Sequence, residues 1–474
     1  MVLPYGAWYA DQQRTFLVPD DWTVHFCRPR DAEPLADREL QSALTAPAEG
    51  KPLSDLASGK HSAVIAVDDI TRPTPTAKIL PLLLDQLARA NIPRERTTIV
   101  IGTGAHRPMD QAEIERKLSP EIASAYRVVI HDFMGNDIRK VGWIGGGPVY
   151  LNRHLTEAEV KICVGSVIPH SETGFGGGAK LVVPGLAGHL TIAHFHGALP
   201  ARRSGQLDPA GRVCDRRGWA EVVARHIGID MAVCAVVNSR RQLAGLFAGD
   251  VVRAHRRAAR LASRVGDTAV PEWPNGGLDI LILNAYPLDT DPIQMGKCLA
   301  LASQLPARCK VLINAASDGV YYHGVGLGGG VDFRRLVGNL PGWAFRPRNL
   351  GAWLRGLGRT AARPSLAARF SFFSWNMQSY AAFTAADSRR GPDRDSQSRR
   401  TSDARLLVYS PRFPSGAFAR RYPRGELYRD WDGLCDTLRS RFNAPTAAVF
   451  PSAPLQCISA GGRAAHGVTG EIER

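Results

Sequence analysis

The chain of 474 residues lacks a run of about eighteen consecutive apolar residues, so its sequence predicts no membrane-spanning helix. Its first residues do not combine a basic start with an apolar run, and we therefore expect no secretory signal. The eight cysteines are scattered and contain no Cys-X-X-Cys spacing, which fits the reducing cytoplasm better than a disulfide framework. No internal repeat is present, and the length suggests two or three ordinary domains.

Acidic residues are fewer than basic ones: the chain has 44 Asp and Glu and 59 Lys and Arg, which gives a formal net charge of +15. Such a balance raises the question of nucleic-acid binding. Much of the excess consists of arginine pairs, at 202–203, 216–217, 240–241, 256–257 and 399–400. Because these pairs are dispersed rather than gathered into one stripe, we interpret them as solvated surface, with a patch that attracts anionic substrates as the alternative. Nucleic-acid binding is not expected.

Apolar residues make up 44% of the chain, enough to bury sizeable cores, and strand patterns alternate with helix patterns. The expected strands are 62–67, 97–101, 127–131, 160–165, 278–284, 309–314, 406–409 and 446–450. The expected helices are 77–90, 187–196, 250–265, 293–303 and 425–441. This alternation is typical of an α/β fold. We therefore predict two α/β domains with the active site in the cleft between them.

The domain boundary is placed by residues that break regular structure. The segment 271–277 is rich in proline and glycine and is expected to be a linker. The first domain is expected to span 1–268, joined by the C-terminal segment 445–474, and the second to span 277–444. Residues 346–405 are rich in arginine, serine and glycine, and we expect irregular surface there.

The stretch 165–199 combines the residue types that a bound cofactor needs. Lys180 lies in a glycine-rich turn, with His170 ten residues before it and His196 sixteen residues after it. A deprotonated lysine is a nucleophile or a covalent anchor. Neutral imidazole carries protons near pH 7 and binds nickel, copper or zinc. Glycines let the backbone pass close to a bulky bound group, so the stretch predicts a cofactor pocket.

Two motifs follow expected strands, where open α/β sheets bind their ligands. In the loop 68–75, Arg72 can hold a carboxylate or phosphate through two parallel hydrogen bonds. A salt bridge between Asp69 and Arg72 would explain the same residues without a ligand. His106, on the turn after the next strand, is either a general base or an incidental loop residue.

A third motif, 284–297, follows the first strand of the second series. Gln294 and Lys297 are three residues apart, so on a helix they share one face. Near the start of that helix they would project over the edge of the sheet. They are either site residues or ordinary surface residues.

Three familiar motifs fail when their requirements are checked. The segment 174–180 outlines a phosphate loop, but alanine and leucine stand where glycine and Ser/Thr are required. His194 and His196 have HxH spacing, yet residues two apart on a helix face different ways, so they are not expected to bind one metal. The segment 324–329 matches GxGxxG, but no strand directly precedes it and no acidic residue lies about twenty positions on.

Five ordered motifs together resemble the nickel-dependent lactate racemase family, whose members racemise or epimerise 2-hydroxy acids. These motifs are DDITRPTP, GTGAHRP, PHSETGFGGGAK, VPGLAGHLTIAHFH and NAYPLDTDPIQMGK. The resemblance runs from Leu3 to about His196, resumes at 284–297 and near 449–456, and is weakest across 346–405. The joint match is far more specific than any of its parts.

The resemblance implies a cofactor, the nickel-pincer nucleotide (pyridinium-3,5-bisthiocarboxylic acid mononucleotide nickel), whose two sulfurs and one ring carbon bind nickel. By motif position, Lys180 would be its covalent anchor. His196 would be the protein ligand that completes the square plane of nickel. His106 and His170 would be the two acid–base residues.

The remaining motif residues would surround this cofactor and the substrate. Asp69, Thr71 and Arg72 would hold cofactor phosphate or substrate. Gln294 and Lys297 would contact substrate or cofactor from the second domain. The resemblance also implies cofactor-maturation enzymes as partners, since the protein does not make this group itself.

The implied chemistry explains why these residue types are needed. The hydrogen on C2 of a 2-hydroxy acid is barely acidic, so it leaves more readily as hydride to an electron sink than as a proton. One histidine would take the hydroxyl proton while the planar 2-keto acid forms. Return of hydride to the other face inverts C2, and a second histidine serves the opposite enantiomer.

The expected substrate is lactate, a bulkier 2-hydroxy acid or a sugar acid. The aromatic residue that closes the site in some family members has Trp343, Trp353 and Trp375 as candidates. Two alternatives remain open from the residues alone. One is a nicotinamide-dependent 2-hydroxyacid dehydrogenase, and the other is a non-catalytic binding protein for the cofactor or an anionic ligand.

Overall fold

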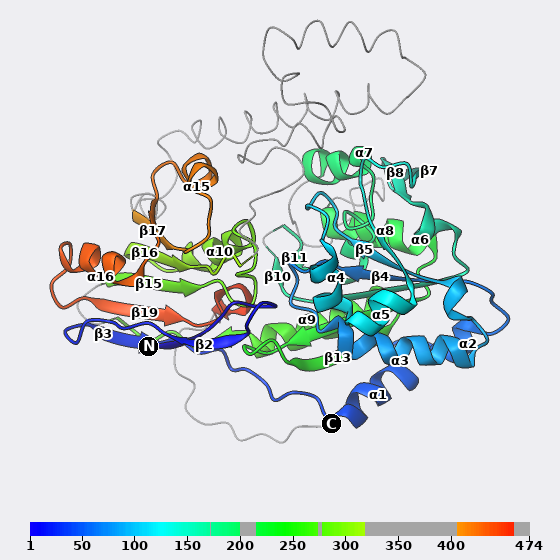
Figure 1. The fold of residues 1–474 in the computed structure, drawn as a ribbon, viewed down its shortest axis with the longest axis horizontal. Helices are drawn as coiled ribbons and strands as arrows, with labels where there is room; N and C mark the ends of the chain where they lie inside the picture. The colour runs from blue at the N-terminus through cyan, green and yellow to red at the C-terminus, as the bar shows by residue number, and fades with distance from the viewer. Residues whose placement is uncertain (171, 200–214, 274–276, 318–404, 459–474) are drawn as a thin grey trace, which may run out of the picture.

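The computed structural model describes residues 1–170, 172–199, 215–273, 277–317 and 405–458. Two six-stranded sheets lie side by side, each covered on both faces, so the chain has the α/β fold that its sequence predicts (Figure 1). In Figure 1 the first sheet along the chain lies on the right and the second on the left.

The first sheet has the strand order β13-β12-β9-β4-β5-β6. Its strands are β4 (Ala63–Asp68), β5 (Thr97–Gly102), β6 (Arg127–Ile130), β9 (Val160–Ser166), β12 (Met231–Val237) and β13 (Leu243–Gly249). Neighbouring strands are parallel, apart from the antiparallel pair β12 and β13. The chain forms β4, β5 and β6 in one direction and then places β9 on the other side of β4. The order therefore reverses between β4 and β9, which is where such sheets bind ligands.

The side chains of β4 alternate between the two faces of this sheet. Ile65 and Val67 face one helical layer, whereas Val64 and Ala66 face the other. The first layer contains α1 (Asp37–Thr45), α2 (Leu53–Ala57), α3 (Thr76–Arg89), α4 (Gln111–Leu118) and α5 (Pro120–Ala125). The second contains α6 (Arg153–Glu157), α7 (His189–Ala193), α8 (Arg216–Ile227) and α9 (Arg253–Val265).

The second sheet has the order β18-β17-β16-β15-β19-β3, with all neighbours parallel. Its strands are β3 (Thr23–Phe26), β15 (Leu278–Asn284), β16 (Ala307–Ile313), β17 (Arg405–Tyr409), β18 (Glu426–Tyr428) and β19 (Thr446–Phe450). One face packs on α10 (Cys298–Ala302) and α15 (Ser415–Arg421). The other packs on α16 (Trp431–Arg439) and the hairpin of β1 (Val2–Tyr5) and β2 (Gln12–Thr15). The strand order reverses between β15 and β19.

Three small strand pairs complete the described part. They are β7 (Ile138–Ile144) with β8 (Gly147–Asn152), β10 (Pro169–His170) with β11 (Gly174–Phe175), and β14 (Asp267–Thr268) with β20 (Cys457–Ile458). In the view of Figure 1, the hairpin of β10 and β11 is seen between the two sheets.

In the two large sheets, strands before the expected linker at 271–277 belong to the first sheet and strands after it belong to the second. One strand is an exception. β3, from the N-terminal part of the chain, pairs with β19 in the second sheet. β19 is itself an internal strand of that sheet, because β15 flanks its other side. The division into 1–268 with 445–474, and 277–444, stays a prediction.

Most predicted elements coincide with observed ones, and one is partly wrong. The expected strands at 278–284 and 446–450 are β15 and β19. The helix expected at 425–441 begins only at Trp431, because β18 occupies Glu426–Tyr428 and the Asp430 side chain caps the helix start. The segment 324–329 and the three candidate tryptophans lie outside the described residues.

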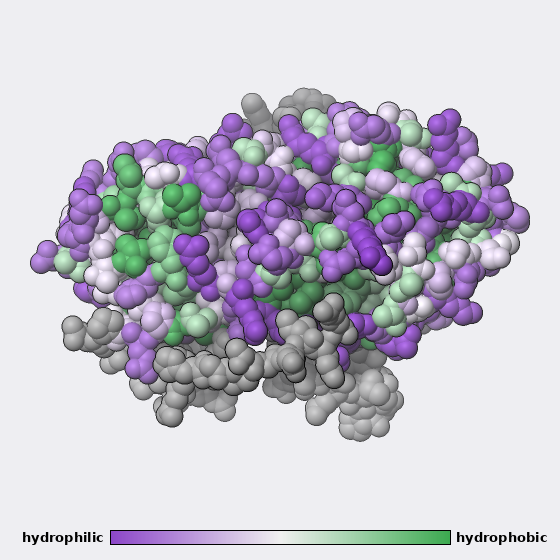
Figure 2. Space-filling model, turned by 90° about the horizontal axis from the view of Figure 1, so that it is seen from below, coloured by the Kyte–Doolittle hydropathy of each residue, from purple (hydrophilic) through white to green (hydrophobic). Residues whose placement is uncertain are grey.

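The described surface is mixed in character. Figure 2 shows hydrophilic residues over most of one face, with apolar patches between them. The large apolar side chains that stay exposed in the described part are Val2, Leu17, Phe26 and Trp143. None of the helices in the described ranges has the length and apolar character needed to cross a bilayer.

Candidate active site

The predicted site residues lie in the segments that follow the carboxyl ends of strands in both sheets. Asp69, Thr71 and Arg72 follow β4, His106 follows β5, His170, Lys180 and His196 follow β9, and Gln294 and Lys297 follow β15. The structure brings these residues into two clusters, one around Asp69 and one around Lys180. The charges of the first cluster act on the second, as the pKa values below show.

The first cluster centres on the Asp69 carboxylate, which is only 3% exposed. Its Oδ2 lies 2.6 Å from Nδ1 of His106. Its Oδ1 accepts hydrogen bonds from the backbone N–H of Thr71 at 3.0 Å and from the Thr71 hydroxyl at 2.6 Å. Burial alone would raise the pKa of Asp69, but His106, Arg72 and Thr71 outweigh it and hold the pKa below its usual range. The charged carboxylate therefore fixes the orientation of the His106 ring.

Arg72 joins this cluster to the second sheet. Its Nη1 donates to the Thr71 hydroxyl at 2.8 Å and to Oε1 of Gln294 at 3.0 Å. Lys297 Nζ donates to the same Gln294 oxygen at 2.9 Å. Burial, reinforced by Arg72, lowers the pKa of Lys297 to about 7. Two cations around one amide oxygen form a place where a carboxylate would bind.

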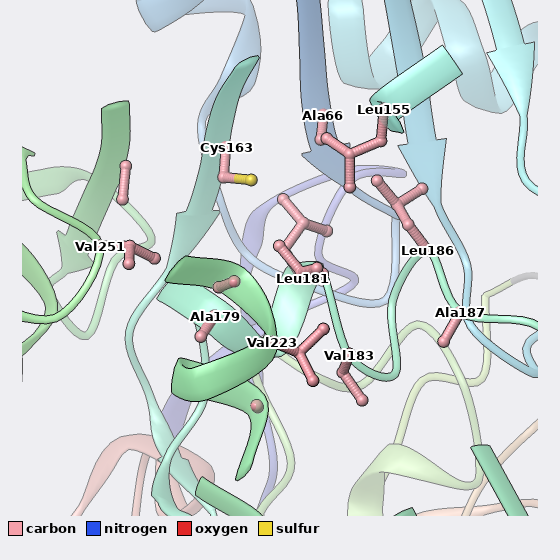
Figure 3. Packing of buried hydrophobic residues seen from close by; sticks show 14 of the residues in the cluster. Ala66, Leu155, Cys163, Ala179, Leu181, Val183, Leu186, Ala187, Val223 and Val251 are labelled. Carbon is pink, nitrogen blue, oxygen red and sulfur yellow. The ribbon is translucent and has the colours of Figure 1, made fainter. Parts of the chain in front are cut away.

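The turn that carries Lys180 is anchored from both sides. Ala179 and Leu181 are buried, and Figure 3 shows them in the apolar cluster beside Cys163 of β9 and Val223 of α8. The turn Gly178–Leu181 is a short 3₁₀ helix, and Gly177 before it has a φ of +71°. A Cβ at Gly177 would lie 2.6 Å from the carbonyl oxygen of Ser166. The loop therefore requires glycine at this position.

Lys180 and His170 meet within the second cluster. Nζ of Lys180 lies 2.8 Å from Nε2 of His170. Burial lowers the pKa of Lys180 well below its ordinary value; Glu172 opposes this shift, and Lys297 and Arg72 add to it. Burial and the cations Lys180, Lys297 and Arg72 also lower the pKa of His170. Burial therefore favours the uncharged forms of both groups, and these forms are suited to nucleophilic attachment and to proton transfer.

His196 lies in a π-helical turn, His194–Ala198, that continues α7. Its Nδ1 lies 3.1 Å from the carbonyl oxygen of Ile192, and its Nε2 lies 3.8 Å from Oε2 of Glu172. The side chain is 39% exposed, so the ring is open to a bound group on one side. Removal from bulk water lowers the pKa of His196, against the effect of Glu172. Because Nδ1 donates to a carbonyl, Nε2 carries the lone pair that a metal would use.

The neighbouring His194 takes no part in this cluster. Its ring packs against that of Trp219, with centroids 4.9 Å apart. Within the described ranges, no three side chains of His, Cys, Asp or Glu come together as a metal site.

Three site residues escaped the sequence-based prediction. Arg216 Nη1 pairs with Oε1 of Glu172 at 2.7 Å, and its Nη2 donates to the carbonyl oxygen of His196 at 2.6 Å. Arg217 donates to three successive carbonyl oxygens of the segment 175–177. The expectation that this arginine pair is solvated is wrong, because both side chains are buried and supply donors to carbonyl groups that need them. Glu172 lies inside a quoted motif, whereas the only signal for the arginines was their place before an apolar helical run.

Comparison with known proteins finds lactate racemases among the proteins that are similar in sequence and in fold. Residues 9–206 match the lactate racemase N-terminal domain. The lactate racemase of Lactiplantibacillus plantarum is 29% identical over 299 residues, covering 60% of this chain and 68% of that protein. The lactate racemase of Thermoanaerobacterium thermosaccharolyticum is 30% identical over 289 residues, covering 58% and 65%. The aligned regions thus span about two thirds of these relatives.

Two solved structures share the fold. The lactate racemase apoprotein of T. thermosaccharolyticum matches with a TM-score of 0.63 and 21% identity, covering 97% of this chain and 99% of that one. A protein from Thermotoga maritima matches with a TM-score of 0.58 and 16% identity, covering 90% and 100%. The matched domain at 9–206 and the relatives at about 30% identity thus make this chain similar to the lactate racemases.

Proposed function

We propose that this chain interconverts the stereoisomers of a 2-hydroxy acid, lactate or a related acid, as a racemase or epimerase. Its family relationship makes it an isomerase. The observation that carries the proposal is two imidazoles, each held by a partner, on either side of the junction that Arg72 and Gln294 span. His106 is bonded to Asp69, His170 lies 2.8 Å from Lys180, and Arg72 and Lys297 share the Gln294 oxygen. A storage protein has no need of two bases beside a cationic carboxylate site.

The donor set fits the nickel-pincer nucleotide that the sequence resemblance implies. Lys180 offers a neutral amine, the form that attaches covalently to a carboxyl-derived group. His196 offers one imidazole nitrogen with its lone pair, a ligand that nickel(II) accepts. The described ranges hold no cluster of three ligating side chains, which suits a group that brings its own donors.

The residues of this chain provide binding and proton transfer. When bound, the cofactor would supply an electron sink for the C2 hydrogen and its electron pair. Arg72 and Lys297 hold the substrate carboxylate, with Gln294 orienting both cations. His106, oriented by Asp69, takes the proton of the C2 hydroxyl. His170 takes the corresponding proton from the opposite enantiomer.

The reaction is tested with protein produced together with cofactor-maturation enzymes, which we propose as its partners. Enantiopure L- and D-lactate, bulkier 2-hydroxy acids and sugar acids are incubated separately, and the products are resolved by chiral chromatography. We expect either enantiomer of the true substrate to move towards the same mixture without added nicotinamide. Substrate-dependent reduction of NAD would instead indicate a dehydrogenase. Retained nickel with no change of configuration in any acid would indicate a binding protein.

The cofactor roles are tested by mass and metal content. Lys180→Ala should remove the covalent adduct from the intact mass, while Lys140→Ala, at an exposed lysine, should keep it. His196→Ala should lower the nickel content, while the exposed His61→Ala should not. An adduct that persists without Lys180, or full nickel occupancy without His196, would place the cofactor elsewhere.

We also propose the cytoplasm as its location. The seven cysteines of the described part are all unpaired. Cys163 and Cys234 lie buried on the adjacent strands β9 and β12, and burial raises the pKa of both thiols to about 12. Such thiols suit a reducing compartment. Quantitative alkylation of all of them in the freshly isolated, denatured protein would agree with this location.

A further inference from the structure

Lys117 is a fully buried lysine that the proposed reaction does not use. It lies in the last turn of α4, and none of its surface is exposed. Its ammonium donates to Oδ1 of Asp68 at 2.7 Å and to the carbonyl oxygens of Arg72 and Thr74 at 3.2 and 3.3 Å. These bonds use all three donors of the ammonium. The ring of Trp8, 4.8 Å from Nζ, covers the group from another side.

The partners of Lys117 are the two ends of the loop that carries the Asp69 cluster. Asp68 is the last residue of β4, and the two carbonyl groups lie at the far end of the same loop. Lys117 therefore ties the start of the loop to its end. Asp69 lies between the tied points, and Arg72 is held directly through its carbonyl group, whereas the side chains of both enter the site.

The same contact reaches the second cluster through Asp68. Oδ2 of Asp68 accepts hydrogen bonds from the Thr74 hydroxyl at 2.5 Å and from the backbone N–H of Ser166 at 3.0 Å. Ser166 ends β9, and the chain continues from it to His170. One buried carboxylate thus links the loop after β4 to the segment after β9, on either side of the reversal in strand order.

The charge of Lys117 is not needed to hold α4. Asp110 and Glu113 form a capping box at the start of that helix, and Arg107 pairs with Glu113. A buried ammonium is costly unless it is paired, and an apolar side chain of similar size would fill the same space without a partner. Burial lowers the pKa of Lys117, and the ion pair with Asp68 at 2.7 Å opposes that shift. The hydrogen bonds of the ammonium therefore act on the loop rather than on the helix.

We propose that Lys117 is a positioning residue, which sets the Arg72 guanidinium and the Asp69 carboxylate in the site by holding both ends of their loop. The inference rests on the proposed function, in which Arg72 binds the substrate carboxylate and Asp69 orients His106. Loss of the ammonium should misplace both side chains, although neither touches it.

The first test compares Lys117→Met with Lys60→Met, at an exposed lysine. Methionine keeps the apolar stem and removes the three hydrogen bonds. We expect KM to rise and kcat to fall, each by roughly tenfold or more, because misplaced catalytic groups bind the substrate less well and react more slowly. A merely structural role would reduce the amount of active enzyme, lowering the apparent kcat with KM unchanged, and would overturn the proposal. Lys60→Met should leave both constants unchanged.

A double variant guards against misfolding, since Lys117→Met leaves the Asp68 carboxylate buried without its cation. Asp68→Asn combined with Lys117→Met removes both charges, and we expect its thermal stability to approach that of the unmodified chain. The carbonyl groups of Arg72 and Thr74 still lack their donor, so KM should stay raised. A return of KM to the original value would show that Lys117 only balances the charge of Asp68, which would overturn the proposal.

A third measurement does not depend on racemisation. The short hydrogen bond between Asp69 and the His106 ring N–H predicts a low-field proton NMR signal, assigned by its loss in His106→Ala. Lys117→Met should shift or broaden this signal, and Lys60→Met should not. An unchanged signal in Lys117→Met would overturn the positioning role. If the unmodified protein racemises no acid, the proposed function fails, while this signal still decides whether Lys117 positions Asp69.

Discussion

At the scale of single residues, burial sets the protonation states of the candidate site. Desolvation lowers the pKa of Lys180 and favours its neutral amine, whereas the partners of Asp69 lower the pKa of its carboxyl group despite burial. Opposite effects on two buried groups require that the groups differ in their neighbours. Asp69 has a hydrogen-bonded histidine and threonine, while the nearest partner of Lys180 is the neutral ring of His170. Such perturbed groups are typical of catalytic sites.

Burial of Lys180 should lower the free energy of unfolding of the cofactor-free protein. In the cofactor-free protein, burial lowers the pKa of Lys180 in the folded state, while the unfolded chain binds a proton up to about pH 10.4. The free energy of unfolding should therefore rise with pH across the window below that value. Lys180→Met removes the penalty and should stabilise the cofactor-free protein at pH 7 by about 1 kcal/mol. Thermal denaturation at several pH values measures the difference, which should vanish as the pH approaches 10.4.

Lys140→Met serves as the matched control, because that lysine is exposed. It should leave the melting temperature and its pH dependence unchanged. A Lys180→Met variant that is less stable than the parent at every pH would show that the amine is charged and paired in the fold.

Because Asp69 is paired with His106, replacing either residue should lower the rate of the reaction without loss of the cofactor. His106→Ala should lower kcat by roughly a hundredfold or more, the usual contribution of an acid–base group. Asp69→Asn should also lower kcat, because the ring loses the acceptor that fixes its orientation. Both variants should keep the adduct at Lys180, measured by intact mass. Unchanged rates from both enantiomers would remove the pair from the mechanism, and Asp132→Asn, at an exposed aspartate, should behave like the parent.

At the scale of elements, the sequence predicts best where apolar runs end in breakers. β4, α3 and β5 follow this pattern, and the observed bounds differ from the predicted ones by a single residue at most ends. β12 and β13 are absent from the prediction, because short apolar runs do not distinguish a buried strand from a buried helix.

The candidate site could be predicted only in part from local pattern. Each motif is visible alone, but its convergence with the others depends on strand order, which no short segment encodes. The family resemblance supplied that grouping for His106, Lys180 and Gln294. Arg216 and Arg217 could not be recognised, because an arginine pair before a helix is usually solvated. Their burial results from the carbonyl groups that other segments place around them.

The start of α8 is the element on which the His196 turn depends. Arg216 bonds the Glu172 carboxylate and the carbonyl oxygen of His196 at once. Arg216→Gln should destabilise the protein by about 2 kcal/mol, as expected for lost hydrogen bonds of a charged group. Hydrogen exchange should speed up in the turn His194–Ala198, and nickel content should fall. Arg225→Gln, at an exposed arginine of the same helix, should change neither property. Unaltered exchange in that turn would show that α7 alone holds His196.

At the scale of the whole molecule, the N-terminal loop 6–11 joins the two sheets beside the site. Asp289, after β15, accepts hydrogen bonds from the backbone N–H groups of the first two loop residues at 2.8 and 3.1 Å. At the other end of the loop, Asp11 accepts from the Tyr286 hydroxyl at 2.9 Å and from Nε of Arg241 at 3.0 Å. Arg241 belongs to the turn between β12 and β13 in the first sheet, so the loop contacts both halves.

Substitution of Asp11 tests whether this loop sets the distance between the sheet edges. Its carboxylate has one partner from each side, and its backbone φ of +46° is already strained, so the contacts must favour the bent loop. Asp11→Ala should lower the free energy of unfolding by about 1–2 kcal/mol, since the side chain is one-third exposed (32%). It should also raise KM, because the contact between Arg72 and Gln294 spans the same junction. Thermal denaturation and steady-state kinetics measure both effects, with the exposed Asp20→Ala as control. A lower stability with unchanged KM would mean that the contact between Arg72 and Gln294 holds the site together without the loop.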